Sequence, residues 1–228
     1  MTIELYNDDC MIGMKNYEDN HFDLAIVDPP YGIGVPKQLH SSGSWSNKQE
    51  VTLTTYKRGD WDDERPDKSY FEELFRVSKR QIIWGGNYFT DYLYPSKHWI
   101  IWDKKRHPKM SFAQAELAWC SFGRNVRFFR RSWILDKNNV SNNPTKAAHY
   151  TRIHPTQKPP ALYHWILRNY AEKGYKILDT HLGSGSVAMA CYDHGFDLVG
   201  YEIDKDYFDA AMNRLQNHKK QLSLFGAF

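Results

Sequence analysis

The chain has 228 residues, of which 41% are hydrophobic and 25% charged, and its formal net charge is +3. A chain of this length can bury one sizeable core, so we expect a single domain over residues 1–228. Its start lacks a basic segment followed by an apolar core, and no apolar run approaches the roughly 20 residues that span a bilayer. Cys10, Cys120 and Cys191 have no motif spacing, which favours buried thiols in a reducing compartment.

Charge is distributed unevenly along the chain. Residues 97–168 carry 14 Lys and Arg against 3 Asp and Glu, so their net charge is +11 and that of the remainder is −8. Within this stretch Arg124, Arg127, Arg130 and Arg131 alternate with aromatic residues, which suits phosphate contacts combined with groove or base contacts. A solvated basic face is the alternative. We favour nucleic-acid contact for these arginines.

The first elements in chain order are two strands, at residues 3–6 and 24–27. The second strand is an apolar run that ends at Asp28-Pro29-Pro30-Tyr31. Because prolines lack a backbone N–H, this turn can continue neither a ladder nor a helix, and its carbonyl groups face outward beside the Asp28 carboxylate. A proline turn that merely closes a buried strand is the alternative.

Two acceptors beside an aromatic ring suit a flat amine, such as the exocyclic amino group of a nucleobase. The lone pair of that nitrogen is delocalised into the base and must be localised before it can attack an electrophile. Asp28 and the Pro29 carbonyl can each accept one N–H while Tyr31 stacks on the base, and charge-assisted bonds of this type contribute roughly 1.5–3 kcal/mol each. We therefore predict catalytic roles for Asp28, Pro29, Pro30 and Tyr31.

Residues 32–60, which follow this turn, are rich in Gly, Ser, Lys and Asn. They predict a mobile loop that closes over DNA and includes Lys37 as a contact, with a surface insertion as the alternative. A helix at 70–78 and a strand at 81–84 come next, followed by strands around 98–102 and 115–122. This alternation indicates a doubly wound α/β sheet.

The second half of the chain contains a strand at 176–179, a glycine-rich turn and a helix that begins near residue 187. Gly183 and Gly185 allow the backbone to approach a ligand at the helix N-terminus, where nucleotide-like cofactors bind. Glu202 ends the next strand, where it can accept hydrogen bonds from ribose hydroxyls. The glycine pattern fits a nicotinamide cofactor as well as S-adenosylmethionine. We favour S-adenosylmethionine, because a methyl donor completes the amine chemistry inferred at Asp28.

Together these motifs resemble the DNA amino-methyltransferases of the beta group, in which the catalytic tetrapeptide precedes the cofactor loop. Tyr6-Asn7-Asp8-Asp9-Cys10 is similar to the acidic segment near the cofactor adenine, and Trp84-Gly85-Gly86-Asn87-Tyr88-Phe89 to the strand and loop beside the target base. His154-Pro155-Thr156-Gln157-Lys158-Pro159 is similar to the segment that helps to hold the methionine end, and its last proline also suits a helix start. The resemblance covers most of residues 6–209.

The resemblance implies a Rossmann-like, mostly parallel sheet of seven strands, a circularly permuted motif order and a small basic target-recognition insertion at 121–150. The strands near 98–102 and 115–122 are expected to include an antiparallel edge pair. No metal is expected, because the sulfonium already activates the methyl group. The implied cofactor contacts are Asp8, Asp28, Thr156, Lys158, Asp179, His181, Gly183, Ser184, Gly185, Ser186 and Glu202.

One residue departs from the family pattern. The chain has Asp179-Thr180-His181 where the family usually has Asp-Pro-Phe. A histidine there could make cofactor binding pH-sensitive, since histidine titrates near neutrality. We favour a neutral, hydrogen-bonded histidine, and no Cys or His at zinc-ligand spacing accompanies it.

The predicted function is site-specific methylation of a base extruded from double-stranded DNA. Adenine N6 is favoured over cytosine N4, because the family more often pairs Asp in the first motif position with adenine. A protein glutamine methyltransferase usually begins its motif with Asn and places it after the cofactor loop, and a noncatalytic DNA-binding relative is expected to have lost Asp28 or the glycines. Both are disfavoured.

The C-terminal pentapeptide Gln221-Leu222-Ser223-Leu224-Phe225 resembles the peptide by which bacterial replication proteins dock on the sliding clamp. A terminal segment that packs on the last helix is the alternative. We expect a cytoplasmic protein of a bacterial or phage-infected cell. The sequence leaves open whether it forms a homodimer, which DNA sequence it recognises and whether a cognate restriction enzyme exists.

Overall fold

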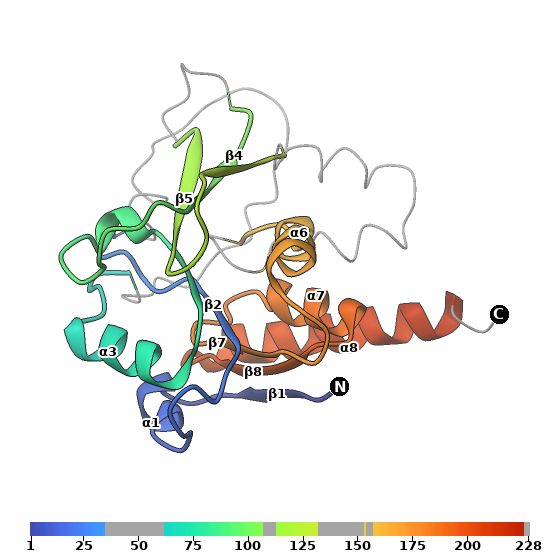
Figure 1. Cartoon of the computed structure of the whole chain (residues 1–228). Helices are drawn as coiled ribbons and strands as arrows, with labels where there is room; N and C mark the ends of the chain where they lie inside the picture. The colour runs from blue at the N-terminus through green and yellow to red at the C-terminus, as the bar shows by residue number, and fades with distance from the viewer. Residues whose placement is uncertain (35–61, 107–112, 132–152, 154–156, 226–228) are drawn as a thin grey trace, which may run out of the picture.

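The structure is a computed structural model that describes residues 1–34, 62–106, 113–131, 153 and 157–225 (Figure 1). The helices are α1 (Cys10–Met14), α3 (Lys68–Val77), α6 (Pro160–Tyr170), α7 (Ser186–His194) and α8 (Lys205–Phe225), with a short 3-10 helix η1 (Gly86–Tyr88). The strands are β1 (Ile3–Tyr6), β2 (Leu24–Val27), β3 (Gln81–Trp84), β4 (Trp99–Asp103), β5 (Ala115–Cys120), β6 (Arg127–Arg130), β7 (Lys176–Asp179) and β8 (Asp197–Tyr201).

These strands form one sheet with the order β1-β8-β7-β2-β3-β5-β4-β6. Neighbouring strands are parallel except at β5, which runs antiparallel to both β3 and β4. The predicted doubly wound, mostly parallel α/β fold is therefore confirmed.

Two details of the predicted sheet are wrong. Within the described residues the sheet has 8 strands and not seven, because Arg127–Arg130, which we assigned to the target-recognition insertion, forms β6 beside β4. Phe129 of β6 packs on the core, with its ring 5.8 Å from that of Trp165. The antiparallel strand β5 is also not at an edge, since it pairs on both sides and β4 and β6 lie beyond it.

Helices cover both faces of the sheet (Figure 1). Successive side chains of a strand point to opposite faces. Accordingly, Leu24 and Ile26 of β2 pack in the core cluster that includes α6, α7 and α8, whereas Ala25 and Val27 pack in the cluster that includes α1 and α3. All four residues are at most 1% exposed, which explains why β2 is a continuous apolar run.

The strand register brings two distant motifs to one edge of the sheet. β2 is parallel to β7, with Leu24 opposite Ile177 and Ala25 opposite Leu178. The carboxyl ends of the two strands therefore lie side by side. Asp28 follows one of them and Asp179 ends the other, as the sequence predicted for a shared site.

Several further expectations can be compared with the structure. The three cysteines are buried, as predicted. Across the described ranges, none of the helices combines the length and the apolar character that a bilayer crossing requires. Residues 35–60 of the predicted loop and 132–150 of the predicted insertion lie outside the described residues. The pentapeptide from Gln221 is the end of α8, and its docking on a clamp stays a prediction, as does a homodimer.

The two phenylalanines of β6 offer a test of its place in the sheet. We expect Phe129→Ala to lower the free energy of unfolding by about 1–2 kcal/mol, less than the cost for a fully buried phenylalanine because Phe129 is half-buried. Phe128 is 53% exposed, so Phe128→Ala should change stability by at most about 0.5 kcal/mol. Urea denaturation of both variants measures the difference, and equal stabilities would contradict the packing of β6 on the core.

Candidate active site

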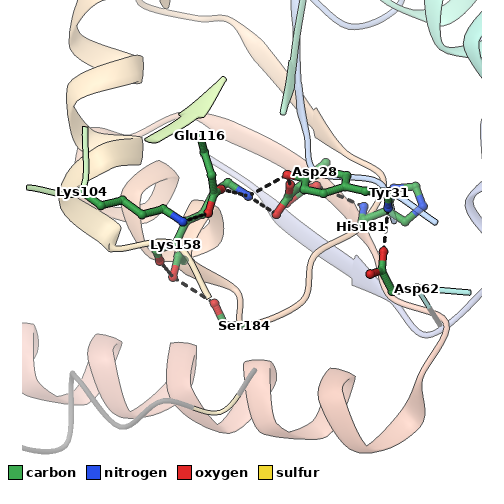
Figure 2. Close-up of polar contacts among 10 residues, drawn as sticks. Asp28, Tyr31, Asp62, Lys104, Glu116, Lys158, His181 and Ser184 are labelled. Carbon is green, nitrogen blue, oxygen red and sulfur yellow. Dashed lines mark hydrogen bonds and ion pairs between the residues drawn. The ribbon is translucent and has the colours of Figure 1, made fainter. Parts of the chain in front are cut away.

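Both carboxylate oxygens of Asp28 are held by other side chains (Figure 2). The Tyr31 hydroxyl donates to Oδ1 at 2.6 Å, and the Lys158 ammonium donates to Oδ2. Lys158 Nζ also lies 3.4 Å from the Tyr31 oxygen. The predicted acceptor of the site is thus hydrogen-bonded before any base is present.

The ring of Tyr31 was predicted to stack on a target base. In the structure it stacks on Tyr88, with the centroids 5.0 Å apart and the planes inclined by 17°. Tyr88 is 39% exposed, so this pair of rings presents aromatic surface at the site. Tyr88 comes from the segment that resembles the loop beside the target base, and the structure brings it next to the catalytic turn.

Asp62 anchors the turn and was missed by the sequence analysis. Its Oδ1 accepts hydrogen bonds from the backbone N–H groups of Tyr31, at 2.7 Å, and Gly32, at 3.2 Å. Asp62 is 2% exposed, and its carbonyl accepts from Gly34 N at 3.0 Å. Pro29 is buried and Pro30 half-buried in the same turn. Nothing local in the sequence distinguishes Asp62 from the acidic residues beside it.

Gly85 makes room for the Tyr31 ring. Its φ is +68°, a conformation that favours glycine. A Cβ at this position would lie 2.1 Å from Tyr31 Cε1, which is closer than real atoms approach. The glycine after β3 therefore fixes where the catalytic tyrosine can lie.

Lys158 belongs to a chain of four charged side chains: Lys104, Glu116, Lys158 and Asp28 (Figure 2). Its Nζ lies 3.2 Å from Glu116 Oε2, and the other oxygen of Glu116 is held by Lys104. The Lys158 side chain is 2% exposed, and its ammonium lies 5.1 Å from the centre of the Trp84 ring. The buried ammonium is therefore surrounded by acidic and aromatic groups.

The charges favour the ionised forms of Lys158 and Glu116. Burial alone would lower the pKa of Lys158, but Asp28 and Glu116 outweigh it and raise the pKa. Burial alone would raise the pKa of Glu116, but the two ammonium groups lower it to about 2. Burial lowers the pKa of Lys104, although Glu116 opposes this effect. Glu116 therefore remains a carboxylate at any pH at which the protein is used.

The sequence analysis gave no role to Glu116 or Lys104. The alternation of side chains along a strand could have indicated both residues. Glu116 lies two residues before the buried Ala118 and four before the buried Cys120. Lys104 lies two residues after the buried Trp102. These positions continue the face of the sheet that packs on α6. Sequence alone does not say which face that is.

The Lys158 backbone joins the catalytic group to the glycine-rich turn. Ser186 Oγ donates to the Lys158 carbonyl at 2.9 Å and lies 3.1 Å from Ser184 Oγ. Arg214 of α8 donates to the Ser184 carbonyl at 2.8 Å and to Ser186 Oγ at 3.0 Å. Both serines are buried, so their hydroxyls bind protein groups, and a cofactor contact from either one stays a prediction.

The turn itself is closed by Glu202. Gly183 N donates to Glu202 Oε2 at 2.8 Å, while Asn7 Nδ2 donates to the carbonyls of Glu202 and Ile203 at 2.8 and 3.1 Å. The acidic segment that contains Asp8 thus lies against the end of β8, and its place near the cofactor adenine stays a prediction. Asp8 is exposed.

Gly185 has a packing role in addition to its place in the turn. Its φ is +69°, and a Cβ there would lie 3.2 Å from the Ala211 side chain of α8. Packing on α8 thus adds a second reason for glycine here, and the approach of a ligand to this turn stays a prediction.

His181 is neutral near pH 7. Burial lowers its pKa to about 4, and its Nδ1 lies 2.9 Å from Thr180 Oγ1, which in turn lies 2.7 Å from the Tyr70 hydroxyl. These contacts support the favoured alternative of a neutral, hydrogen-bonded histidine. A pH-sensitive role near neutrality is not supported.

Three carboxylates at this edge fit a cationic ligand. Burial and the charges of Asp28 and Glu202 together raise the pKa of Asp179 to about 8, although the hydrogen bond from His181 N and the charge of Lys158 oppose this shift. Burial also raises the pKa of Glu202. A ligand with a positive charge would relieve the repulsion among these groups, and S-adenosylmethionine carries a sulfonium and an ammonium.

The predicted DNA contacts are only partly described. Arg124, Arg127 and Arg130 are exposed, and Arg130 Nε lies 3.5 Å from Asp103. Arg131 is half-buried, and its carbonyl accepts from Trp102 Nε1 at 3.1 Å. Lys37 and Thr156, a predicted cofactor residue, lie outside the described residues.

Comparison with known proteins gives the class of this protein. Residues 82–213 match the DNA methylase family of the N6/N4 type. The chain is 24% identical over 243 residues to the type II methyltransferase M.HpaI of Haemophilus parainfluenzae, covering 90% of this chain and 71% of that protein. It is 29% identical over 276 residues to M.ScaI of Streptomyces caespitosus, covering 96% and 83%.

Solved structures support the same fold. The M1.HpyAVI–SAM complex has a TM-score of 0.58 at 17% identity and covers 93% of this chain and 100% of that one. The cytosine-N4-specific PvuII DNA methyltransferase has a TM-score of 0.59 at 12% identity, with coverages of 96% and 91%.

The chain therefore belongs to the N6/N4 DNA methylase family, whose members use S-adenosylmethionine. The predicted class, cofactor and DNA substrate are confirmed at this level. Membership does not favour a protein glutamine methyltransferase or a noncatalytic DNA-binding protein. It leaves the choice between adenine and cytosine undecided.

Asp62 provides a test of how the catalytic turn is held. Asp62→Ala leaves the part-buried N–H groups of Tyr31 and Gly32 without their acceptor, so we expect a loss of about 1–2 kcal/mol in stability together with reduced methyl transfer. Asp62→Asn keeps a side-chain oxygen and should retain most of both. Urea denaturation and transfer of labelled methyl groups measure the two effects, and indistinguishable alanine and asparagine variants would contradict the anchoring role.

Proposed function

We propose that this chain methylates adenine N6 in duplex DNA, with Asp28, Pro29, Pro30 and Tyr31 as its catalytic turn. The observation that carries this proposal is the position of Asp28. Its carboxylate follows β2, lies beside the end of β7 and bonds to the hydroxyl of an aromatic ring that stacks on a second ring. S-adenosylmethionine supplies an activated methyl group, because its sulfonium is a good leaving group.

The residues of the turn prepare the amine. Asp28 and the Pro29 carbonyl each accept one N–H of the extruded base, so that the nitrogen lone pair is localised and can attack. Tyr31 and Tyr88 provide a ring surface on which the base stacks, which offsets part of the few kcal/mol that extrusion costs. After transfer the nitrogen carries an extra proton, which leaves through the hydrogen bond to Asp28.

Other residues act on the cofactor side. The carboxylates of Asp28, Asp179 and Glu202 attract the positively charged end of the cofactor, and Glu202 accepts from the ribose hydroxyls. Ile203 follows Glu202 and is 70% exposed, which supports an apolar contact with the adenine of the cofactor. On the DNA side, the exposed Arg124 and Arg127 support phosphate contacts.

Adenine is proposed because aspartate occupies the first position of the catalytic tetrapeptide. PvuII methyltransferase, which is similar in fold, is a cytosine-N4 enzyme, so fold does not support either base over the other. Incubating the protein with labelled S-adenosylmethionine and duplex DNA, followed by mass spectrometry of the nucleosides, identifies the product. N6-methyladenine supports the proposal, whereas N4-methylcytosine, label in protein or no label in DNA contradicts it.

Asp28→Ala tests the catalytic carboxylate. We expect cofactor affinity to stay within a few-fold of wild type and kcat to fall by about 100-fold or more, as when other preorganised polar groups are removed. The control is Asp23→Ala, which changes an aspartate directly before the same strand. Isothermal titration calorimetry and the labelled-methyl assay give the two quantities. Loss of cofactor binding in proportion to activity would contradict a role in the chemical step.

The pH dependence of cofactor binding tests the cluster around Asp179. The pKa of Asp179 is raised to about 8, so its carboxyl is largely protonated at pH 7 in the free protein. A bound cation favours the carboxylate form of Asp179, so cofactor binding releases a proton. Cofactor affinity should therefore increase with pH by up to about tenfold per unit below pH 8 and become constant above it. Asp179→Asn should remove the slope. Calorimetric titrations from pH 6 to 9 measure it, and a flat profile in the wild type would contradict the assignment.

A further inference from the structure

We propose that Glu116 is a positioning residue that takes over the ammonium of Lys158 when the amino group of the target base arrives at Asp28. This inference rests on the proposed role of Asp28. It concerns a residue to which the sequence motifs assign no role.

The ammonium occupies an acceptor that the base needs. Lys158 Nζ donates to Asp28 Oδ2, and the Tyr31 hydroxyl donates to Oδ1. An exocyclic amine that donates to Oδ2 therefore competes with the ammonium for that oxygen. A cationic donor binds a carboxylate more strongly than a neutral amine does, so the base competes at a disadvantage.

Glu116 removes this disadvantage, because Lys158 Nζ already lies 3.2 Å from its Oε2. When the ammonium leaves Asp28, it stays paired within the same buried site. A small rotation of the side chain is sufficient for this change, since the Lys158 backbone is fixed by the bond from Ser186 Oγ at 2.9 Å and by the start of α6. Lys104 holds the other oxygen of Glu116 and keeps the carboxylate in place (Figure 2).

The charges of these four side chains show why Lys158 requires both of its carboxylate partners. Lys104 and Lys158 balance Glu116 and Asp28. Once Glu116 is neutralised, Asp28 is the carboxylate that still pairs with the Lys158 ammonium within the described part of the chain. Lys158 then holds Asp28 continuously, and the base amine cannot replace it.

Glu116→Gln tests the proposal. At saturating cofactor and DNA we expect kcat to fall by about 10- to 100-fold, the range for loss of one charge-assisted hydrogen bond, while cofactor affinity changes less than about twofold. Glu72→Gln, which neutralises an exposed carboxylate on α3, is the control and should have wild-type kcat. A kcat of Glu116→Gln within twofold of wild type overturns the proposal.

Two double variants separate positioning from a structural role. The double variant Glu116→Gln with Lys104→Met removes one charge of each sign, so it can fold even if the single variant does not. Its kcat should be as low as that of Glu116→Gln, because Lys158 still holds Asp28. Glu116→Gln with Lys158→Met has no competing ammonium, so its kcat should match that of Lys158→Met alone. Losses that multiply in this second double variant overturn the proposal.

A structure with duplex DNA and S-adenosylhomocysteine gives a readout without activity. We expect Lys158 Nζ to remain on Glu116 and to lie beyond hydrogen-bond distance of Asp28, with the amino group of the base in its place. Lys158 retained on Asp28 beside a bound base amine overturns the inference. A wild-type protein that transfers no methyl group to any DNA contradicts the proposed function instead, so the two failures are distinguishable.

Discussion

The ammonium of Lys158 lies between the carboxylates of Asp28 and Glu116, on a side chain that is 2% exposed. Removing one partner of a buried ion pair costs about 3–5 kcal/mol, because the other charge is left without compensation. Ion pairs therefore connect the end of β2, the start of β5 and the segment that leads into α6. The conformation of the catalytic turn depends on this arrangement, since Tyr31 and Lys158 share the oxygens of Asp28.

The same lysine connects two halves of the site. Its side chain reaches the catalytic turn, while its carbonyl accepts from Ser186 at the start of α7, where Arg214 of α8 also binds. A movement of the Lys158 segment would therefore disturb two parts of the site. One is the glycine-rich turn, which is predicted to hold the cofactor, and the other is the Asp28 carboxylate, which is predicted to hold the base. This link explains why a lysine followed by two prolines lies between the two motifs: the prolines fix the backbone direction into α6.

Several features could be predicted because they are local. β2 and β7 are short apolar runs that end in a turn, and Asp28 and Asp179 follow from their position at those ends. The number of strands could not be predicted in the same way. Arg127 to Arg130 has two phenylalanines between two arginines, which suits an exposed nucleic-acid contact as well as an outer strand with one ring turned inward. Pairing with β4 and the contact between Phe129 and Trp165 decide between them.

By itself the sequence determined the class of fold, the motif order and the carboxylate at the end of the second strand, because apolar periodicity and hydrogen-bonding chemistry are properties of short segments. Only the tertiary structure decided which charges surround that carboxylate. β5 runs antiparallel to β3, with Ala118 opposite Trp84, so its start and not its end lies at the edge where β2 ends. Glu116 therefore reaches Lys158 and Asp28 because of strand direction, which pairing between distant segments sets and no local pattern contains.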